Sequence, residues 1–261
     1  MDVKLIQLSD SHLHEQPGKR LIGIDTDASL RAVVDLAGAE ENVNAILATG
    51  DLSQDGSLQS YQRFVEFVSP LNVPIHWLPG NHDDVDYFHA PQDGFPLSSR
   101  STLDLGAWRI IMLDSVVPGK DHGKLAQSEL DYLADQMQDC DGRHCLVVLH
   151  HQPIATGADW LDTMQLYNDG AFFNVIQQYD TVRAVIYGHV HQAFVKDLDG
   201  IRFMSVPSTC FQFKPDSVGF ALDDALPGYR CLVLKESGSI ETEVRRVAEF
   251  DLSLDKDVEG Y

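Results

Sequence analysis

The sequence is poor in basic residues. Its 19 lysines and arginines stand against 40 aspartates and glutamates, which gives a formal net charge of −21. A protein that binds the nucleic-acid backbone needs a basic surface, so this balance argues against a nucleic-acid partner. It also argues against attachment to an anionic membrane surface. An anionic substrate must therefore be attracted by a local positive charge, which bound metal ions would supply.

The sequence also lacks long apolar runs and cysteine motifs. No apolar run approaches the roughly 20 residues that cross a bilayer. The four cysteines show no C-x-x-C spacing, and no signal peptide precedes them. We therefore expect reduced, mostly buried thiols in a cytoplasmic protein. Because no repeat or linker divides the chain, we expect a single domain over residues 1–261, with a mobile acidic tail from about residue 251.

The chain does contain a series of short apolar segments that end abruptly in polar residues, within a composition that is 44% hydrophobic. These segments cover residues 3–8, 45–48, 75–78, 145–149 and 182–187, and they are followed by Ser9-Asp10-Ser11-His12, Thr49-Gly50-Asp51, Pro79-Gly80-Asn81-His82-Asp83, His150-His151 and Gly188-His189-Val190-His191. Buried strands of this kind place such side chains at the carboxyl ends of a parallel sheet, where open α/β folds build their sites.

The segments between the first three strands have helical patterns. Asp27 can cap a helix that runs to about Ala39, and Ser57 can cap a second helix that carries Tyr61 and Phe64 on its inner face. The order β-α-β-α-β implies right-handed crossovers and a parallel sheet.

The second half of the chain predicts antiparallel hairpins as well as helices. Asp199-Gly200 between two apolar-alternating runs is a strong signal for a type I′ hairpin. Further hairpins are predicted at residues 101–113 and 229–245, helices at 125–137 and 170–179, and an irregular, lid-like segment at 153–168. Both halves contribute strands, so we expect an α/β fold of two mixed sheets packed face to face with helices outside, a four-layer α/β/β/α sandwich.

The polar residues at the strand ends have the donor groups of a metal centre. They are two carboxylates, one amide and four imidazoles: Asp10, His12, Asp51, Asn81, His150, His189 and His191. One catalytic ion takes three or four protein ligands, so seven suit two ions if one carboxylate bridges them. Two ions ~3.5–4 Å apart can hold both the attacking and the leaving oxygen of a phosphoryl displacement. Oxygen and nitrogen ligands without sulfur fit Mn, Fe, Zn or Co better than Mg or Ca.

These motifs, in this order, resemble the five motifs of the calcineurin-like metallophosphoesterases. The closer resemblance is to the bacterial class III 3′,5′-cyclic AMP phosphodiesterases, and it covers nearly the whole length. It rests on residues 48–52 and 78–83, His150-His151 before Pro153, Pro207-Ser208-Thr209-Cys210, Gln212-Phe213-Lys214-Pro215 and the terminal Glu259-Gly260-Tyr261. Gln152 departs from the Pro or His that relatives often carry. The resemblance implies the calcineurin-like sandwich fold and hydrolysis of cyclic AMP to 5′-AMP.

The resemblance also implies a role for each site residue. Asp10, His12 and His191 would hold the first ion, Asn81, His150 and His189 the second, and Asp51 would bridge the two. Water activated by the ions would attack phosphorus in line with the leaving 3′ oxygen. His82 would contact the phosphate and protonate the leaving oxygen, and Asp83 would orient His82. His12, Asn81 and His191 would also lie against the substrate.

The sequence alone leaves several interpretations of the function open. The substrate could be another small phosphodiester, such as a 2′,3′-cyclic nucleotide or a glycerophosphodiester, or the protein could be a nucleotide sensor without turnover. The oligomeric state does not follow from the sequence. Strand alternation is expected to point His151 away from the site. The following residues could approach the substrate or could be ordinary loop and core residues: His14, Thr209, Cys210, Phe211, Phe213, Trp160 and residues 157–169, which could cover the site.

Overall fold

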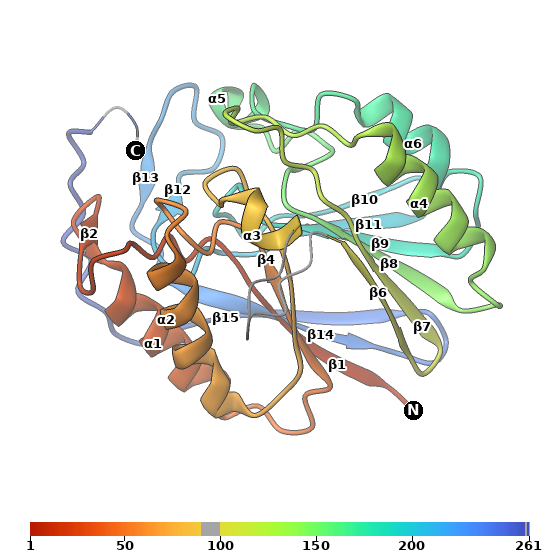
Figure 1. Ribbon diagram of the computed structural model, residues 1–261, viewed down its shortest axis with the longest axis horizontal. Coiled ribbons are helices and arrows are strands. Elements are labelled where there is room, and N and C mark those ends of the chain that lie inside the picture. The colour runs from red at the N-terminus through yellow and green to blue at the C-terminus, as the bar shows by residue number, and fades with distance from the viewer. Residues whose placement is uncertain (90–99, 259, 261) are drawn as a thin grey trace.

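A computed structural model of the protein describes residues 1–89, 100–258 and 260, and it shows two sheets stacked between two layers of helices (Figure 1). The first sheet has the order β15 (Ile240–Arg246), β14 (Gly228–Leu234), β1 (Val3–Leu8), β4 (Ala45–Thr49) and β5 (Ile75–Leu78). The second has the order β10 (Val195–Leu198), β11 (Ile201–Ser205), β9 (Val182–Tyr187), β8 (His144–Leu149), β7 (Trp108–Met112) and β6 (Ser101–Leu105). Both sheets mix parallel and antiparallel pairs, which confirms the predicted α/β sandwich.

The central strands bury both of their faces, which explains why their sequences are mostly apolar. In β1, Leu5 packs between the two sheets, whereas Ile6 and Leu8 pack on the other side. In β8, Leu146 and Val148 face the inter-sheet core, and their neighbours face outward. Because neighbouring residues point to opposite faces of a strand, both faces must be mostly apolar, and the buried polar side chain of β1, Gln7, is hydrogen-bonded.

Each outer face is covered by helices with one apolar stripe. The first sheet is covered by α1 (Thr26–Ala37) and α2 (Leu58–Val68), and the second by α4 (Gln127–Gln138) and α6 (Asp169–Ile176). Leu30 and Phe64 from the first pair lie in the same core cluster as Ile6, and Leu133 and Phe172 from the second pair lie in the core cluster of the second sheet. This packing leaves the loops at the carboxyl ends of the parallel strands free to form a site.

Several predicted boundaries were wrong. The cap of α1 is Asp25, whose side chain accepts from the Ala28 N–H, whereas Asp27 pairs with Arg63. Ser57 caps α2 as predicted. The segment 153–168, expected to be irregular, contains the short helix α5 (Asp159–Asp162). The structure also has short elements for which no helix or strand is predicted from the sequence: β2 (Arg20–Leu21), β3 (Ile24–Asp25), η1 (Ser69–Leu71), β12 (Gln212–Phe213) and β13 (Leu222–Asp223). A short helix, α3 (Val85–His89), follows β5. The sequence also predicts a loop at 91–99, and these residues lie outside the described ones.

The predicted hairpins are confirmed by the strand pairs β6–β7, β10–β11 and β14–β15. At the turn between β10 and β11, Asp199 has φ 51° and Gly200 has φ 80°. Positive φ at both central residues is the signature of a type I′ turn, whose twist matches that of the strands it joins.

Where the structure describes it, the acidic C-terminal segment packs against the core cluster of the second sheet. Leu252, Leu254 and Val258 contact that cluster, and Lys256 Nζ lies 2.6 Å from Asp224. The mobility expected for 251–261 and the single domain over 1–261 stay predictions, and residues 259 and 261 lie outside the description. Among the described residues, none of the helices has both the length and the apolar character needed to span a bilayer. The four cysteines are free and buried.

Candidate metal centre

The polar strand ends of both sheets meet at one edge of the sandwich. Strands β1, β4 and β5 are mutually parallel, so their carboxyl ends lie together, and β8 and β9 end on the same side in the other sheet. The two sheets are joined there by hydrogen bonds. Gln7 Nε2 donates to the Tyr187 carbonyl at 3.1 Å, and the His189 N–H donates to Asp10 Oδ1 at 3.1 Å. The topology therefore brings residues 10, 51, 81, 150, 189 and 191 to one place.

The backbone that carries these side chains is locally strained. Five of the seven predicted ligands have left-handed φ angles: Asp10 at 56°, His12 at 48°, Asp51 at 50°, His189 at 66° and His191 at 47°. Such angles cost free energy for residues with a Cβ, and they persist where the surrounding structure imposes them, commonly at functional sites. The strain turns each side chain from the strand direction toward the shared edge.

The residues predicted for the first ion form one buried cluster. The ligand atoms of Asp10, His12 and His191 lie within 4.8 Å of one another. His191 Nε2 is 3.5 Å from Asp10 Oδ1 and 3.2 Å from His12 Nε2. All three side chains are fully buried, so their donor atoms face each other and not solvent.

The residues predicted for the second ion adjoin this cluster through Asp51. His150 Nε2 lies 3.2 Å from Asn81 Oδ1 and 3.3 Å from Asp51 Oδ2. The same Asp51 oxygen is 3.9 Å from His12 Nε2. Asp51 therefore stands between the two groups, where a bridging carboxylate would lie.

Hydrogen bonds behind three of the imidazoles fix which nitrogen faces the site. The outward Nδ1 atom lies 2.6 Å from Gln54 Oε1 in His12, 2.8 Å from the Thr49 carbonyl in His150 and 2.9 Å from the Phe211 carbonyl in His191. Since an oxygen acceptor holds the proton on Nδ1, the Nε2 lone pair points inward. Such outer partners are typical of metal-binding histidines. Gln54 has no distinguishing sequence motif, so sequence reasoning missed it.

The donor set fits a metal centre. Asp10 Oδ2, Asp51 Oδ2 and both ring nitrogens of His189 are buried without a hydrogen-bond partner among the described residues. Buried polar atoms without partners are costly, and positive ions at these atoms would satisfy them. Burial keeps the pKa of His12 and His189 well below the ordinary value, which favours the neutral ring that binds metals.

The charge pattern around Asp51 also suits cation binding. Burial alone would raise the pKa of Asp51, but the neighbouring His150 and other imidazoles outweigh it, so the pKa lies well below the ordinary value. Burial would in turn lower the pKa of His150, yet Asp51 raises it to about 9. The buried carboxylate thus stays ionised and already attracts positive charge.

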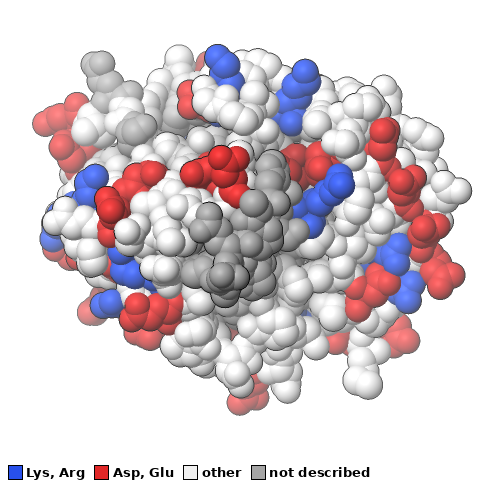
Figure 2. Space-filling view, viewed as in Figure 1, with Lys and Arg blue, Asp and Glu red and all other residues white. Residues whose placement is uncertain are grey.

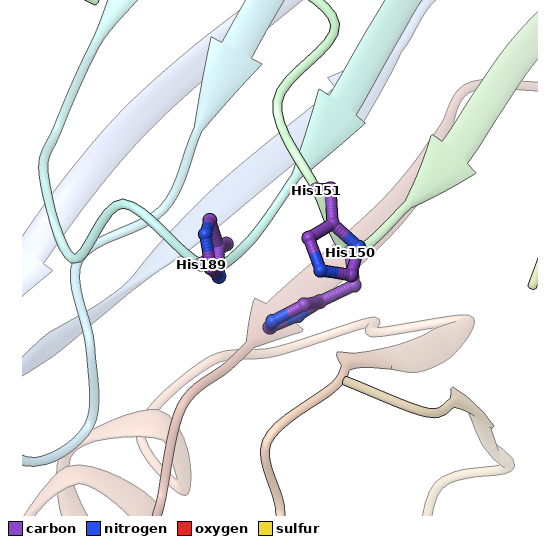
Figure 3. Close-up of side chains that lie close together, drawn as sticks. All are labelled: His150, His151 and His189. Carbon is purple, nitrogen blue, oxygen red and sulfur yellow. The ribbon is translucent and has the colours of Figure 1, made fainter. Parts of the chain in front are cut away.

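His151 does not point away from the site, so the expectation from strand alternation was wrong. The β8 strand ends at Leu149, and the two histidines follow it in bends, where alternation no longer applies. The His151 ring lies 4.9 Å from the His150 ring and 4.8 Å from the His189 ring, measured between centroids. Figure 3 shows the three rings gathered around a common space.

The two residues predicted to be catalytic occupy different environments. The ring of His82 is partly exposed, lies 5.1 Å from the His12 ring, and its backbone N–H donates to Asp51 Oδ1 at 2.9 Å. Asp83 is buried and accepts from the N–H groups of Gly80 and Ser53 at 2.8 and 2.9 Å. Burial, with the neighbouring Asp51, raises the pKa of Asp83 to about 7. Asp83 therefore binds the loops that carry Asp51 and His82.

A cavity of about 400 Å³ opens beside the cluster. It is lined by Asn81, His82 and His189 from the site and by Asp121, Trp160, Leu161, Thr163, Met164, Phe213, Phe220 and Gly260. Trp160 and Phe213 were among the residues expected near a substrate, and part of the 157–169 segment lies against the cavity. His14 instead faces Asp55 at 3.6 Å, and Phe211 packs behind His12 and His191. Thr209 and Cys210 are buried outside this lining.

Residues 3–193 match the calcineurin-like phosphoesterase family. The chain belongs to this family. The phosphoesterase is 42% identical, over 99% of its length and 95% of the relative's, to the 3′,5′-cyclic adenosine monophosphate phosphodiesterase CpdA of Pseudomonas aeruginosa. It is 37% identical to CpdA of Escherichia coli (strain K12) with the same coverage of both chains.

Solved structures confirm the fold of this phosphoesterase. A dimetal phosphatase from Danio rerio superposes with a TM-score of 0.66 at 14% identity, over 94% of this chain and 99% of that one. The family implies a dinuclear metal centre, and the phosphoesterase has His and Asp groups capable of holding one.

Replacing Gly188 should disturb the phosphoesterase's site. A Cβ at this position would lie 2.2 Å from Ser9 Oγ and 2.7 Å from the Thr49 carbonyl, so the backbone before His189 must shift. We expect Gly188→Ala to lower the free energy of unfolding by about 1–3 kcal/mol and to weaken metal binding. Chemical denaturation and metal titration measure the two effects. Gly170→Ala, where a Cβ meets nothing within 4 Å, is the matched control. Equal metal affinity in both variants would contradict the close-approach argument.

Proposed function

We propose that this phosphoesterase hydrolyses 3′,5′-cyclic AMP to 5′-AMP at a dinuclear metal centre. The observation that carries the proposal is the identity of 37–42%, over 99% of the chain, to relatives named for that reaction. The clustering of the seven predicted donors supports it. The surface charge agrees with a small-molecule substrate, because the basic side chains on the described part of the face in Figure 2 form no continuous patch among the acidic ones.

The ligand assignment forms part of the proposal. Asp10, His12 and His191 would hold one ion, Asn81, His150 and His189 the other, and Asp51 both. Imidazole and carboxylate donors without thiolate suit Mn, Fe, Zn or Co. Bound ions supply a water activated at neutral pH and positive charge opposite the phosphate oxygens. The protein's own contribution is to fix these donors on strained loops between two rigid sheets.

His82 and Asp83 are proposed to serve the reaction itself. His82 lines the cavity beside Asn81, so its ring can reach a phosphate there and give a proton to the leaving 3′ oxygen. We propose His12, Asn81 and His191 as further substrate contacts at the metal edge of the cavity. Asp83 acts indirectly. It accepts hydrogen bonds from the backbone N–H groups of Ser53 and Gly80 and thereby positions His82.

The cavity supports a nucleotide ligand through its two unlike ends. Asn81, His82 and His189 contribute polar groups to the lining, here called the polar end, and Trp160 and Phe213 contribute aromatic rings, here called the aromatic end. The Trp160 ring packs edge-on against Phe213 at 4.8 Å between centroids. An adenine base on the aromatic end would leave its cyclic phosphate at the metals. A volume of about 400 Å³ lies in the usual range of small-molecule sites.

We also infer a single cytoplasmic domain. The two sheets share one inter-sheet core, which supports a single unit over residues 1–261. Four free, buried thiols agree with a reducing compartment.

A substrate panel tests the proposal. Metal-replete enzyme is given 3′,5′-cyclic AMP, 3′,5′-cyclic GMP, 2′,3′-cyclic AMP and glycerophosphocholine, and products are separated by chromatography. We expect the highest kcat/KM for 3′,5′-cyclic AMP, with 5′-AMP as product and no turnover after chelation of the metals. A higher kcat/KM for the 2′,3′-cyclic ester or the glycerophosphodiester would overturn the substrate assignment. Tight binding of cyclic AMP without release of AMP would indicate a sensor.

Trp160→Ala tests whether the base occupies the aromatic end. Stacking of a base on an aromatic ring contributes about 1–3 kcal/mol, so KM for cyclic AMP should rise roughly 5- to 150-fold with little change in kcat. Trp160→Phe, which keeps a ring, should lose less. Hydrolysis of methyl p-nitrophenyl phosphate, which has no nucleobase, should be nearly unaffected. An equal loss on both substrates would place the effect at the reaction centre and not at the base.

A further inference from the structure

His189 lacks an outer partner that the other three predicted histidine ligands have. His12, His150 and His191 each have an oxygen atom within 2.9 Å of Nδ1. Neither ring nitrogen of His189 has a hydrogen-bond partner among the described residues, although the residue is only 4% exposed. If one nitrogen binds a metal, the other must carry a buried N–H without an acceptor. Leaving such a donor unsatisfied costs about 1–3 kcal/mol.

His151 offers an acceptor next to this ring. It is fully buried, and its ring centroid lies 4.8 Å from that of His189 (Figure 3). Its Nδ1 lies 2.8 Å from Ser115 Oγ, and its backbone N–H donates to the same oxygen at 3.3 Å. Its Nε2 has no hydrogen-bond partner among the described residues. One ring nitrogen of each of His150, His151 and His189 lies within 4.8 Å of the others.

We propose that His151 is the positioning residue for the metal ligand His189. The His189 nitrogen that faces away from the ion donates its N–H to Nε2 of His151, and the Nδ1–H of His151 donates to Ser115 Oγ. The hydrogen-bond chain Ser115–His151–His189 then orients a ligand of the second ion, as Gln54 orients His12 at the first ion. The inference rests on the metal centre that the family implies and is independent of which phosphodiester is the substrate.

Direct coordination of the ion by His151 would account for only one of the unpaired buried nitrogens. It would satisfy Nε2 of His151 but would leave the outward N–H of His189 buried and unpaired. The N–H···N bond satisfies both atoms at once. A serine hydroxyl both donates and accepts, so the contact of Ser115 Oγ with Nδ1 is compatible with the tautomer of His151 that carries its proton on Nδ1 and keeps Nε2 as an acceptor.

Metal affinity without substrate is the first test. Loss of an outer partner typically weakens metal binding 10- to 100-fold, so we expect His151→Phe to raise the Kd of the weaker-bound ion by that factor in calorimetric titration. His151→Gln, whose side-chain oxygen can replace Nε2 as acceptor, should recover most of the affinity. His76→Phe, on β5 outside the cluster, is the control for a generic His-to-Phe change.

Thermal unfolding of the metal-free proteins should show His151→Phe at least as stable as the native chain, because it removes a buried unpaired nitrogen. Unchanged metal affinity in a folded His151→Phe protein would overturn the proposal.

Nitrogen NMR of the metal-loaded protein is the second test and needs no variant. In protein with ¹⁵N-labelled histidine and bound ¹¹³Cd²⁺, we expect a nitrogen–nitrogen coupling between His151 and His189 across the hydrogen bond. Cadmium–nitrogen couplings should appear for His150 and His189 and not for His151. A cadmium coupling to His151 would make it a ligand and overturn the positioning role, as would the absence of any coupling to His189. Neither result would bear on cyclic AMP hydrolysis, so this inference and the proposed function fail separately.

Discussion

Asp51→Asn should lower kcat/KM for cyclic AMP by about a thousandfold, the scale on which removal of one electrostatic group from a reaction centre acts. One Asp51 oxygen lies 3.3 Å from His150 Nε2 and 3.9 Å from His12 Nε2, between the two predicted ion sites. Asparagine removes the negative charge that both ions would share. Its remaining oxygen can still accept from the His82 N–H, as Asp51 Oδ1 does at 2.9 Å, so the loop is preserved.

The measurement combines kinetics with metal analysis. We expect purified Asp51→Asn protein to retain a cooperative unfolding transition and to bind less than two equivalents of metal. Asp86→Asn, an exposed residue of α3 with the same change in charge, should match the native enzyme in both assays. A variant that keeps two tightly bound ions and native turnover would remove Asp51 from the bridging position.

His82→Ala should lower kcat for cyclic AMP by about 10²- to 10⁴-fold, the usual contribution of a positioned general acid. The ring lies at the polar end of the cavity, and its backbone is held by Asp51, so truncation removes the imidazole without releasing the loop. The donor set for the metals is unchanged in the variant. We therefore expect two bound ions and a nearly native melting temperature.

The leaving group distinguishes a proton donor from a residue that only binds phosphate. The 3′ oxygen of a ribose is a poor leaving group and needs a proton, whereas p-nitrophenolate leaves without one. The loss in His82→Ala should therefore be much smaller for methyl p-nitrophenyl phosphate than for cyclic AMP. Similar losses on both would assign His82 to phosphate binding. His122→Ala serves as the control, because the His122 ring stacks on Tyr167 and is not part of the cavity lining.

The donor set of the centre was predictable because of where it sits in the sequence. Asp10, Asp51, Asn81, His150 and His189 each follow an apolar run that is too short for a helix and too continuous for an exposed strand. Parallel strands collect their carboxyl ends at one edge, so residues far apart in the chain could be grouped before any contact was known. The resemblance to a known family added the division of these residues between two ions.

The sequence predictions were wrong where tertiary contacts overrode a local sequence pattern. Alternation was applied to His151, but the strand ends one residue before His150, and the bends that follow put both rings on the same side. Asp27 is a plausible cap, yet the helix begins at Thr26, so Asp25 caps it and Asp27 lies in its first turn, paired with Arg63 of the next helix. Gln54 and Phe220 belong to no pattern, and only packing reveals that Gln54 adjoins His12 and that Phe220 lines the cavity.

The amino-acid sequence by itself determined the order of elements, the sandwich class and the donors available at each strand end, because these depend on hydrophobic period and on side-chain chemistry. The tertiary structure decided the left-handed backbone that turns the donors inward, the outer partners that orient three imidazoles, and the place of His151 beside His189. Those features depend on close contact between two sheets, at glycines such as Gly188, and contacts between distant segments leave no periodic signal in the chain.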